Sequence, residues 1–87
     1  MRIKDGFVLR EVAGQAVVIA VGEASKAFHG MINLNNTGKV IWQGIENDLS
    51  EDEIVDNLLE KYDTDIETVK NDVKSMIQKM QAAGVLE

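Results

Sequence analysis

The sequence contains no cysteine, which excludes a disulfide framework, a thiolate nucleophile and a cysteine metal site. It also has no long hydrophobic run, because its longest, Ala16–Val21, is far too short to span a bilayer. The N-terminus, Met1–Asp5, lacks the apolar core that a signal peptide needs. At 87 residues the chain is therefore expected to form one domain, residues 1–87, that is soluble and cytoplasmic.

Positive charge is scarce as well. Nine basic residues stand against fifteen acidic ones, which gives a formal net charge of −6. A nucleic-acid-binding protein neutralises phosphates, and much of its affinity rests on that electrostatic contribution. The acidic balance therefore disfavours nucleic acid as a partner, although it leaves room for a local basic patch.

The N-terminal half is rich in strand-forming residues. Phe7–Val12 and Ala16–Val21 are two such runs, and the turn-forming segment Ala13–Gln15 between them predicts a β-hairpin. Glu23–His29 is a polar connection that could hold a helical turn. Met31–Leu34 then predicts a third strand.

Helix-start signals follow this third strand. Asn35 is a good N-cap ahead of an apolar pattern of helical period. The segments Ser50–Glu53 and Thr64–Glu67 both match the capping box, in which the first and last side chains each accept a hydrogen bond from the other residue's backbone amide. Gly84 is placed to end the last helix, 65–83, in the left-handed conformation that glycine adopts easily.

The second and third helices are separated only by Tyr62–Thr64, which forces a sharp helix-turn-helix corner. Three strands followed by three helices predict an α+β, winged helix-turn-helix-like fold with a three-stranded antiparallel sheet. A winged-helix DNA-binding regulator is thus an alternative, because the second helix of such a corner can enter the major groove. Acids interrupt the basic and amide residues on the outer face of helix 65–83: Lys70, Asn71, Lys74, Gln78 and Lys79 are accompanied by Glu67 and Asp72.

Residues that could support catalysis are few. His29, the only histidine, lies in a predicted loop with no partner pattern around it. The acidic segment 46–53 lacks the alternating oxygens and central glycine of a calcium loop. Gly30 and Gly38 do not match a phosphate-binding loop. The sequence therefore predicts a non-enzymatic protein with no catalytic residue, metal or cofactor.

The predicted third strand, Met31–Leu34, carries neither the charge nor the proline that usually protects a free sheet edge. A peptide could therefore add to it as a fourth strand. We expect the last helix to form the other wall of an adjacent apolar groove, although its apolar residues could instead be core. The predicted peptide-binding residues are Met31, Ile32, Asn33 and Leu34 in the strand, and Val69, Val73, Met76, Ile77 and Met80 in the helix.

The segment Gly30–Gly38, followed by Ile41 and Trp42, resembles the Leu-Asn-Glu-Thr-Gly…Ile-Trp pattern of PqqD-like proteins. The resemblance covers essentially the whole chain and includes the closing Ala83–Glu87. Asn36 departs from the pattern, which usually has glutamate there.

The resemblance implies a RiPP recognition element, a peptide chaperone in the biosynthesis of pyrroloquinoline quinone (PQQ) or of another ribosomally made natural product. Such domains bind the leader segment of a precursor peptide and present it to a modifying enzyme, which in the PQQ pathway is a radical SAM protein. The leader adds to the third strand, and the third helix forms the other side of the cleft. On this chain the resemblance assigns these roles to Met31–Leu34 and to the apolar stripe of the last helix, with no nucleic acid or membrane as partner.

Overall fold

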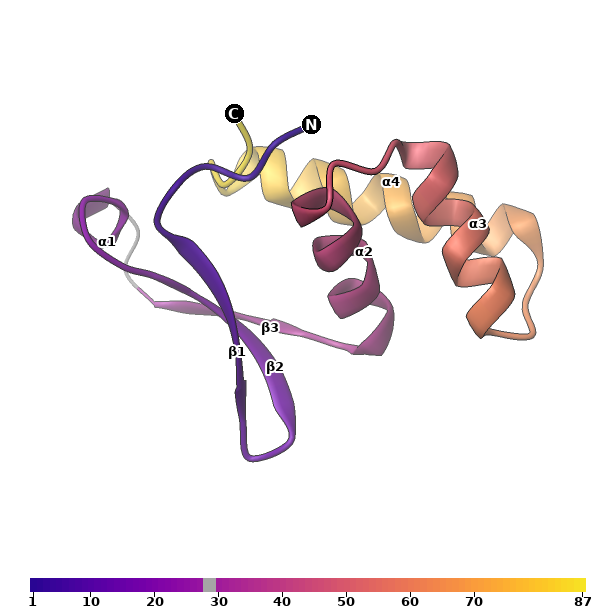
Figure 1. Cartoon of the computed structure of the whole chain (residues 1–87), viewed down its shortest axis with the longest axis horizontal. Coiled ribbons are helices and arrows are strands. Elements are labelled where there is room, and N and C mark those ends of the chain that lie inside the picture. Colours follow the sequence, from indigo (N-terminus) through magenta and orange to yellow (C-terminus); the bar gives the residue numbers. More distant parts are fainter. Residues whose placement is uncertain (28–29) are drawn as a thin grey trace.

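The computed structural model describes residues 1–27 and 30–87, so His29 lies outside the described residues. A three-stranded antiparallel sheet is followed by three longer helices, as the sequence predicts (Figure 1). The connection after the second strand, which the sequence indicates could hold a helical turn, does hold one. The elements are β1 (Phe7–Val12), β2 (Gln15–Ala20), α1 (Ala24–Ala27), β3 (Met31–Leu34), α2 (Asn36–Glu46), α3 (Glu51–Lys61) and α4 (Ile66–Ala82).

β1 and β2 form the predicted hairpin, with Phe7 opposite Ala20 at one end and Val12 opposite Gln15 at the other. Only two residues make the turn, one fewer than predicted, because Gln15 already belongs to β2. Both turn residues have a positive φ, of 52° and 79°. That backbone is the primed turn whose twist matches a hairpin, and glycine at its second position adopts it readily.

Side chains cap the starts of α2 and α3 as predicted. The Asn35 side chain accepts a hydrogen bond from the backbone N–H of Gly38 at 2.7 Å. At α3 the capping box is complete: the Ser50 hydroxyl accepts from the Glu53 amide at 3.1 Å, and the Glu53 carboxylate accepts from the Ser50 amide at 3.0 Å. Both bonds satisfy amides that the first helical turn leaves without a partner.

The start of α4 differs from the prediction by one residue. Its N-cap is Asp65, whose carboxylate accepts from the Thr68 amide at 2.8 Å. The predicted capping box needs the Thr64 amide as a donor to Glu67, but this amide donates to the carbonyl of Tyr62 at 3.1 Å. Because the corner between α3 and α4 uses that amide, the capping box is wrong here and a single aspartate caps the helix.

The two termini lie side by side above the helices (Figure 1). Gly84 has a φ of +77° just after α4 and ends this helix as predicted. The Val85 amide then donates to the Met80 carbonyl at 3.1 Å, which turns the chain back toward the core. Leu86 forms an isolated β-bridge with Ile3, so the two ends of the chain are joined.

The hydrophobic core lies between one face of the sheet and the helices. Trp42 of α2 is fully buried there, together with Val18 of β2 and Val73 of α4. The α2 and α3 helices approach closely at Gly44, where an added Cβ would lie 2.7 Å from Cγ1 of Ile54. This crossing therefore requires glycine. The packing fixes α2 and, with it, the position of β3 just before it in the chain.

Candidate functional site

β3 forms one edge of the sheet, because the strand order is β1-β2-β3. It pairs antiparallel with β2, from Leu34 opposite Ala16 to Met31 opposite Ile19. On its other side β3 has no neighbouring strand within residues 1–27 and 30–87. This free edge is of the kind to which a further strand can pair.

One hydrogen bond shows which backbone groups of β2 face β3. The Val21 amide donates to the Gly6 carbonyl at 2.7 Å, and these two residues extend the register of β1 and β2 by one position. In an antiparallel pair, hydrogen-bonded positions alternate with positions whose backbone groups point away. Counting back by two from Val21 along β2, Ile19 and Val17 bond to β1. Val18 and Ala16 occupy the alternate positions, so their backbone groups point away from β1 and toward β3.

The same alternation continues into β3. Ile32 and Leu34 stand opposite those two β2 residues, so their N–H and C=O groups bond within the sheet. Met31 and Asn33 occupy the intervening positions, so their N–H and C=O groups point outward along the free edge. Two residues of β3 therefore present unpaired donors and acceptors to an incoming strand.

The side chains of β3 alternate between the two faces of the sheet. Ile32 and Leu34 are half-buried and pack against the core. Met31 and Asn33 are exposed on the opposite face, and Met31 is 62% exposed. Any strand added at this edge would place alternate side chains on the same side as Ile32 and Leu34.

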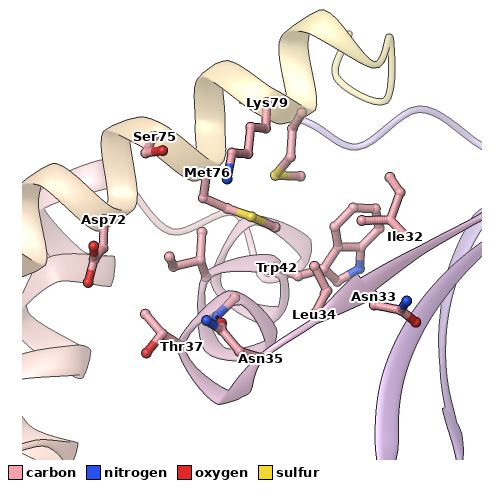
Figure 2. A pocket seen from close by; sticks show the side chains of 13 residues that line it. Ile32, Asn33, Leu34, Asn35, Thr37, Trp42, Asp72, Ser75, Met76 and Lys79 are labelled. Atoms are coloured by element: carbon pink, nitrogen blue, oxygen red, sulfur yellow. Dashed lines mark hydrogen bonds between the residues drawn. The ribbon is translucent and has the colours of Figure 1, made fainter.

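A cavity of about 420 Å³ opens on that side, between β3 and α4 (Figure 2). Its β3 wall is made by Ile32, Asn33 and Leu34, and its α4 wall includes Met76 and Met80. Ile41 and Trp42 of α2 line it between these walls, and Asp72, Ser75 and Lys79 add polar side chains on α4. The cavity is thus a groove with both apolar and polar side chains in its lining, and its β3 wall carries the free edge.

The structure divides the nine residues predicted to bind peptide. Five belong to the cavity lining: Ile32, Asn33, Leu34, Met76 and Met80. The Asn33 side chain lies on the opposite face of the sheet and also lines a hollow there, so it is the backbone of Asn33 that borders the cavity. The Met31 side chain is on the opposite face of the sheet and lines a shallow hollow there with Val17 and Ile19. Only the backbone of Met31 is therefore available at the free edge.

Val69, Val73 and Ile77 are core residues and do not line the cavity. Their role in peptide binding stays a prediction. Their exposed fractions are 4%, 0% and 7%. These residues recur every fourth position, so they share one face of α4, and that face packs against α2 and α3. The groove wall is the flank beside this face, where Met76 lies.

The groove also contains residues that the sequence analysis did not assign to it. Asp72 and Lys79 lie four positions before and three after Met76, the spacing of neighbours on one helix face, and this spacing was an available signal. Trp42 is both fully buried in the core and part of the cavity lining. Its second role depends on how α2 packs behind β3, for which the sequence has no local signal.

Comparison with protein families agrees with this architecture. The family model described as Coenzyme PQQ synthesis protein D (PqqD) matches residues 7–86. The chain belongs to the PqqD family. The resemblance in the segment Gly30–Gly38 is thereby confirmed, and the match spans both walls of the groove. Comparison with curated proteins finds no match.

Two solved structures share the fold of this PqqD-family chain. One is TbiB1 in complex with the TbiA(beta) leader peptide, with a TM-score of 0.81, 24% identity, and coverage of 100% of this chain and 95% of that one. The other is a lasso peptide synthetase B1 complexed with the leader peptide, with a TM-score of 0.80, 14% identity, and coverage of 99% and 95%. At these identities the likeness confirms the predicted α+β fold.

Opposite charges mark the two ends of the groove in this family member. Asp72 and Lys79 are both exposed and both line the cavity from α4. They are seven positions apart, which along a helix corresponds to about 10 Å. In Figure 2 Asp72 lies toward Thr37, at the start of α2, and Lys79 lies at the other end of the cavity. The groove therefore carries a negative charge at one end and a positive charge at the other.

Three carboxyl groups with lowered pKa values belong to the scaffold and not to the groove. Lys39, through a side-chain hydrogen bond and its charge, lowers the pKa of Glu11 and so ties α2 to β1. Backbone N–H groups at the starts of α3 and α4 lower the pKa values of Glu53 and Asp65. The contacts that cause these shifts lie in the elements that hold the groove in place.

Two further observations concern metal binding and membrane crossing. Within 1–27 and 30–87, no three His, Cys, Asp or Glu side chains lie together in a way that could hold a metal ion. No helix in this part of the chain combines the length and the apolar character needed to cross a membrane.

Proposed function

We propose that the chain acts as one domain, residues 1–87, that binds the leader segment of a ribosomally made precursor peptide as a fourth strand on β3. The observation that carries this proposal is the groove, lined in part by apolar side chains, between the outward-facing backbone of β3 and Met76 and Met80 of α4. Strand addition next to an apolar groove is a common mode of peptide recognition.

The two parts of the groove would contribute differently to binding. The N–H and C=O groups of Met31 and Asn33 would form main-chain hydrogen bonds, each with a net value of about 0.5–1.5 kcal/mol. These bonds are independent of the peptide's sequence. Alternate peptide side chains would enter the cavity beside Ile32, Leu34 and Met76, where their shape and polarity would determine selection.

Two comparisons support a leader peptide as the ligand. The matched family is described as a coenzyme PQQ synthesis protein, and both solved structures of the same fold hold leader peptides. We infer that the chain is a chaperone and not a catalyst, and that it presents the peptide to a modifying enzyme, such as a radical SAM protein. The groove supports this role because a peptide bound at the edge of the sheet leaves its flanking segments free for a second protein.

The charge of the helix-turn-helix corner disfavours DNA as the ligand. The first turn of α3 carries Glu51, Asp52 and Glu53, and α4 adds Glu67 and Asp72 among its lysines. A DNA-binding surface here would bring these carboxylates near phosphates. Peptide binding through main-chain bonds and apolar contacts should in addition depend little on salt, whereas DNA binding would weaken steeply.

A pair of substitutions at Asn33 tests the proposal. Peptides are first selected from a display library for binding to the wild-type chain. Asn33→Pro removes the outward N–H, and we expect it to weaken binding of these peptides by about tenfold or more. The matched control, Asn33→Ala, shortens the side chain but keeps the N–H, so it should bind nearly as well as the wild type.

Circular dichroism establishes that both variants are folded before affinities are compared. The proposal is contradicted if folded Asn33→Pro binds the selected peptides as tightly as Asn33→Ala, because the edge amide would then play no part. It is equally contradicted if the library yields no peptide that binds the wild-type chain.

A further inference from the structure

The indole of Trp42 has an unusual position for a buried donor. Trp42 is fully buried, and its Nε1–H has no hydrogen-bond partner within the part of the chain that the structure describes. Buried polar atoms without a partner are rare in folded proteins, because they forfeit the hydrogen bonds they would make to water. An exception of this kind beside a binding cavity points to a ligand that supplies the acceptor once it displaces the side chains that cover the N–H, because Trp42 has no exposed surface in the free chain.

Trp42 lines the groove between its two walls. Figure 2 shows the indole between the β3 side chains Ile32 and Leu34 and Met76 of α4, with its ring nitrogen at the edge nearest β3 in this view. These neighbours are apolar and offer no strong acceptor. The Asn35 side-chain oxygen, also in the lining, already accepts from the Gly38 amide at 2.7 Å.

We propose that Trp42 Nε1–H donates a hydrogen bond to a neutral acceptor, an amide or hydroxyl oxygen, on one side chain of the bound peptide. The inference rests on the proposed function, since it assumes an extended peptide on β3. It makes Trp42 a specificity-determining residue of that site. It also predicts that the peptide carries a glutamine, asparagine, threonine or serine at one position whose side chain enters the cavity.

The acceptor belongs to a side chain and not to the peptide main chain. The main chain of an added strand lies in the plane of the sheet, where its groups pair with Met31 and Asn33. Trp42 comes from α2, which covers one face of the sheet, so only side chains on that face can reach it. Those are the alternate residues that share the face of Ile32 and Leu34.

The acceptor is neutral because of what surrounds it. A carboxylate entering between Ile32, Leu34 and Met76 would lose its hydration, and one indole N–H would not compensate for that loss. The nearest lysine of the lining, Lys79, is exposed at the rim. An apolar side chain would fit the walls but would leave Nε1–H unsatisfied, so the site discriminates against it.

The chain contains a single tryptophan, so its indole N–H gives one unambiguous NMR signal. The probes are the peptides selected from the display library on the wild-type chain. On binding, the indole proton signal should move downfield and its exchange with deuterated water should slow. The matched probe replaces the acceptor residue by leucine, or by valine for threonine. It should still shift the Met31 and Asn33 amides, bind about tenfold or more weakly, and leave the indole signal near its free position.

A protein variant that lacks the indole donor, tested with the same two peptide probes, completes a double-mutant cycle. Trp42→Phe keeps an aromatic ring and removes the donor, so it should bind the two probes with nearly equal affinity. The indole signal of the wild-type chain tests the same bond even where Trp42→Phe is too unstable to use. The inference is overturned if bound peptides shift the Met31 and Asn33 amides but not the indole signal, or if selection yields only apolar residues at the cavity positions. If no peptide shifts those two amides, the proposed function itself fails, which is a distinguishable result.

Discussion

Asn33 stands opposite Val17 in the pairing of β2 and β3, and its backbone N–H and C=O point away from that partner toward the free edge of the sheet. Its neighbour Ile32 stands opposite Val18 and directs the same groups into the sheet. Adjacent residues of one short strand therefore have different roles: one holds the strand in place, and the other is available to a ligand.

This difference predicts opposite effects of proline at adjacent positions. Ile32→Pro removes an N–H that bonds to β2 and should cost about 3 kcal/mol of unfolding free energy. Asn33→Pro removes an N–H without a partner strand and should cost much less, because proline is tolerated at a free strand edge. Urea unfolding of the two variants measures the difference. Equal losses of stability would mean that the assignment of inward and outward residues is incorrect.

Neighbouring residues of α4 provide a second test. Met76 is half-buried in the groove wall, whereas Ile77 is 7% exposed in the core. Ile77→Ala should lower the unfolding free energy by about 2–5 kcal/mol. Met76→Ala should lower it less and should mainly weaken peptide binding. Unfolding curves and peptide titrations of both variants measure these effects. If Ile77→Ala weakens peptide binding by the folded protein more than Met76→Ala does, the groove wall has been assigned to the wrong flank of α4.

The polarity of the groove predicts the charges of its ligands. Peptides selected on the wild-type chain should favour a basic residue near Asp72 and an acidic residue near Lys79. Exposed ion pairs contribute only about 0.2–1 kcal/mol each, so each preference should amount to a few-fold in affinity and should fade at high salt. Selection on the doubly exchanged variant, Asp72→Lys with Lys79→Asp, should reverse the order of the two charges. An unchanged order would show that these side chains do not contact the peptide.

The cap of α4 predicts a pH dependence of stability. Backbone hydrogen bonding from Thr68 lowers the pKa of Asp65 from its ordinary value of 3.8. A carboxyl whose pKa is lower in the folded state contributes stability above its unfolded pKa and loses that contribution as the pH falls through the folded value. Asp65→Asn keeps an acceptor at the N-cap but does not titrate. The melting temperature of the wild type should therefore exceed that of Asp65→Asn near neutral pH, and the difference should shrink below pH 3.8. A difference that stays constant on acidification would exclude this contribution.

The elements could be predicted from sequence where their signals are local. The hairpin turn depends on glycine at position 14, and the caps Asn35 and Ser50 satisfy amides only three residues away. The sequence predicts the cap of α4 one residue too early, because Thr64 and Asp65 are both good N-caps. The hydrogen bond from Thr64 to Tyr62, which depends on the geometry of the corner, decides between them.

The site could be predicted only in part, because it depends on packing. The free edge of β3 could be predicted, because this strand is the last of the three in the sequence and its residues carry no charge. The correct flank of α4 does not, since Val73 and Met76 are both apolar and lie on adjacent faces. Which residues of β3 face outward depends on the register set through the Gly6–Val21 bond, a contact between residues far apart in the sequence.

Amide hydrogen exchange at β3 tests the central claim most directly. In the free protein the amides of Ile32 and Leu34 should exchange slowly, because they bond to β2, and those of Met31 and Asn33 should exchange fast. With a selected peptide at saturation, the Met31 and Asn33 amides should become as protected as their neighbours, since a fourth strand would accept their hydrogen bonds. If these two amides still exchange fast while the peptide is bound, the peptide does not add to β3 and the account is contradicted.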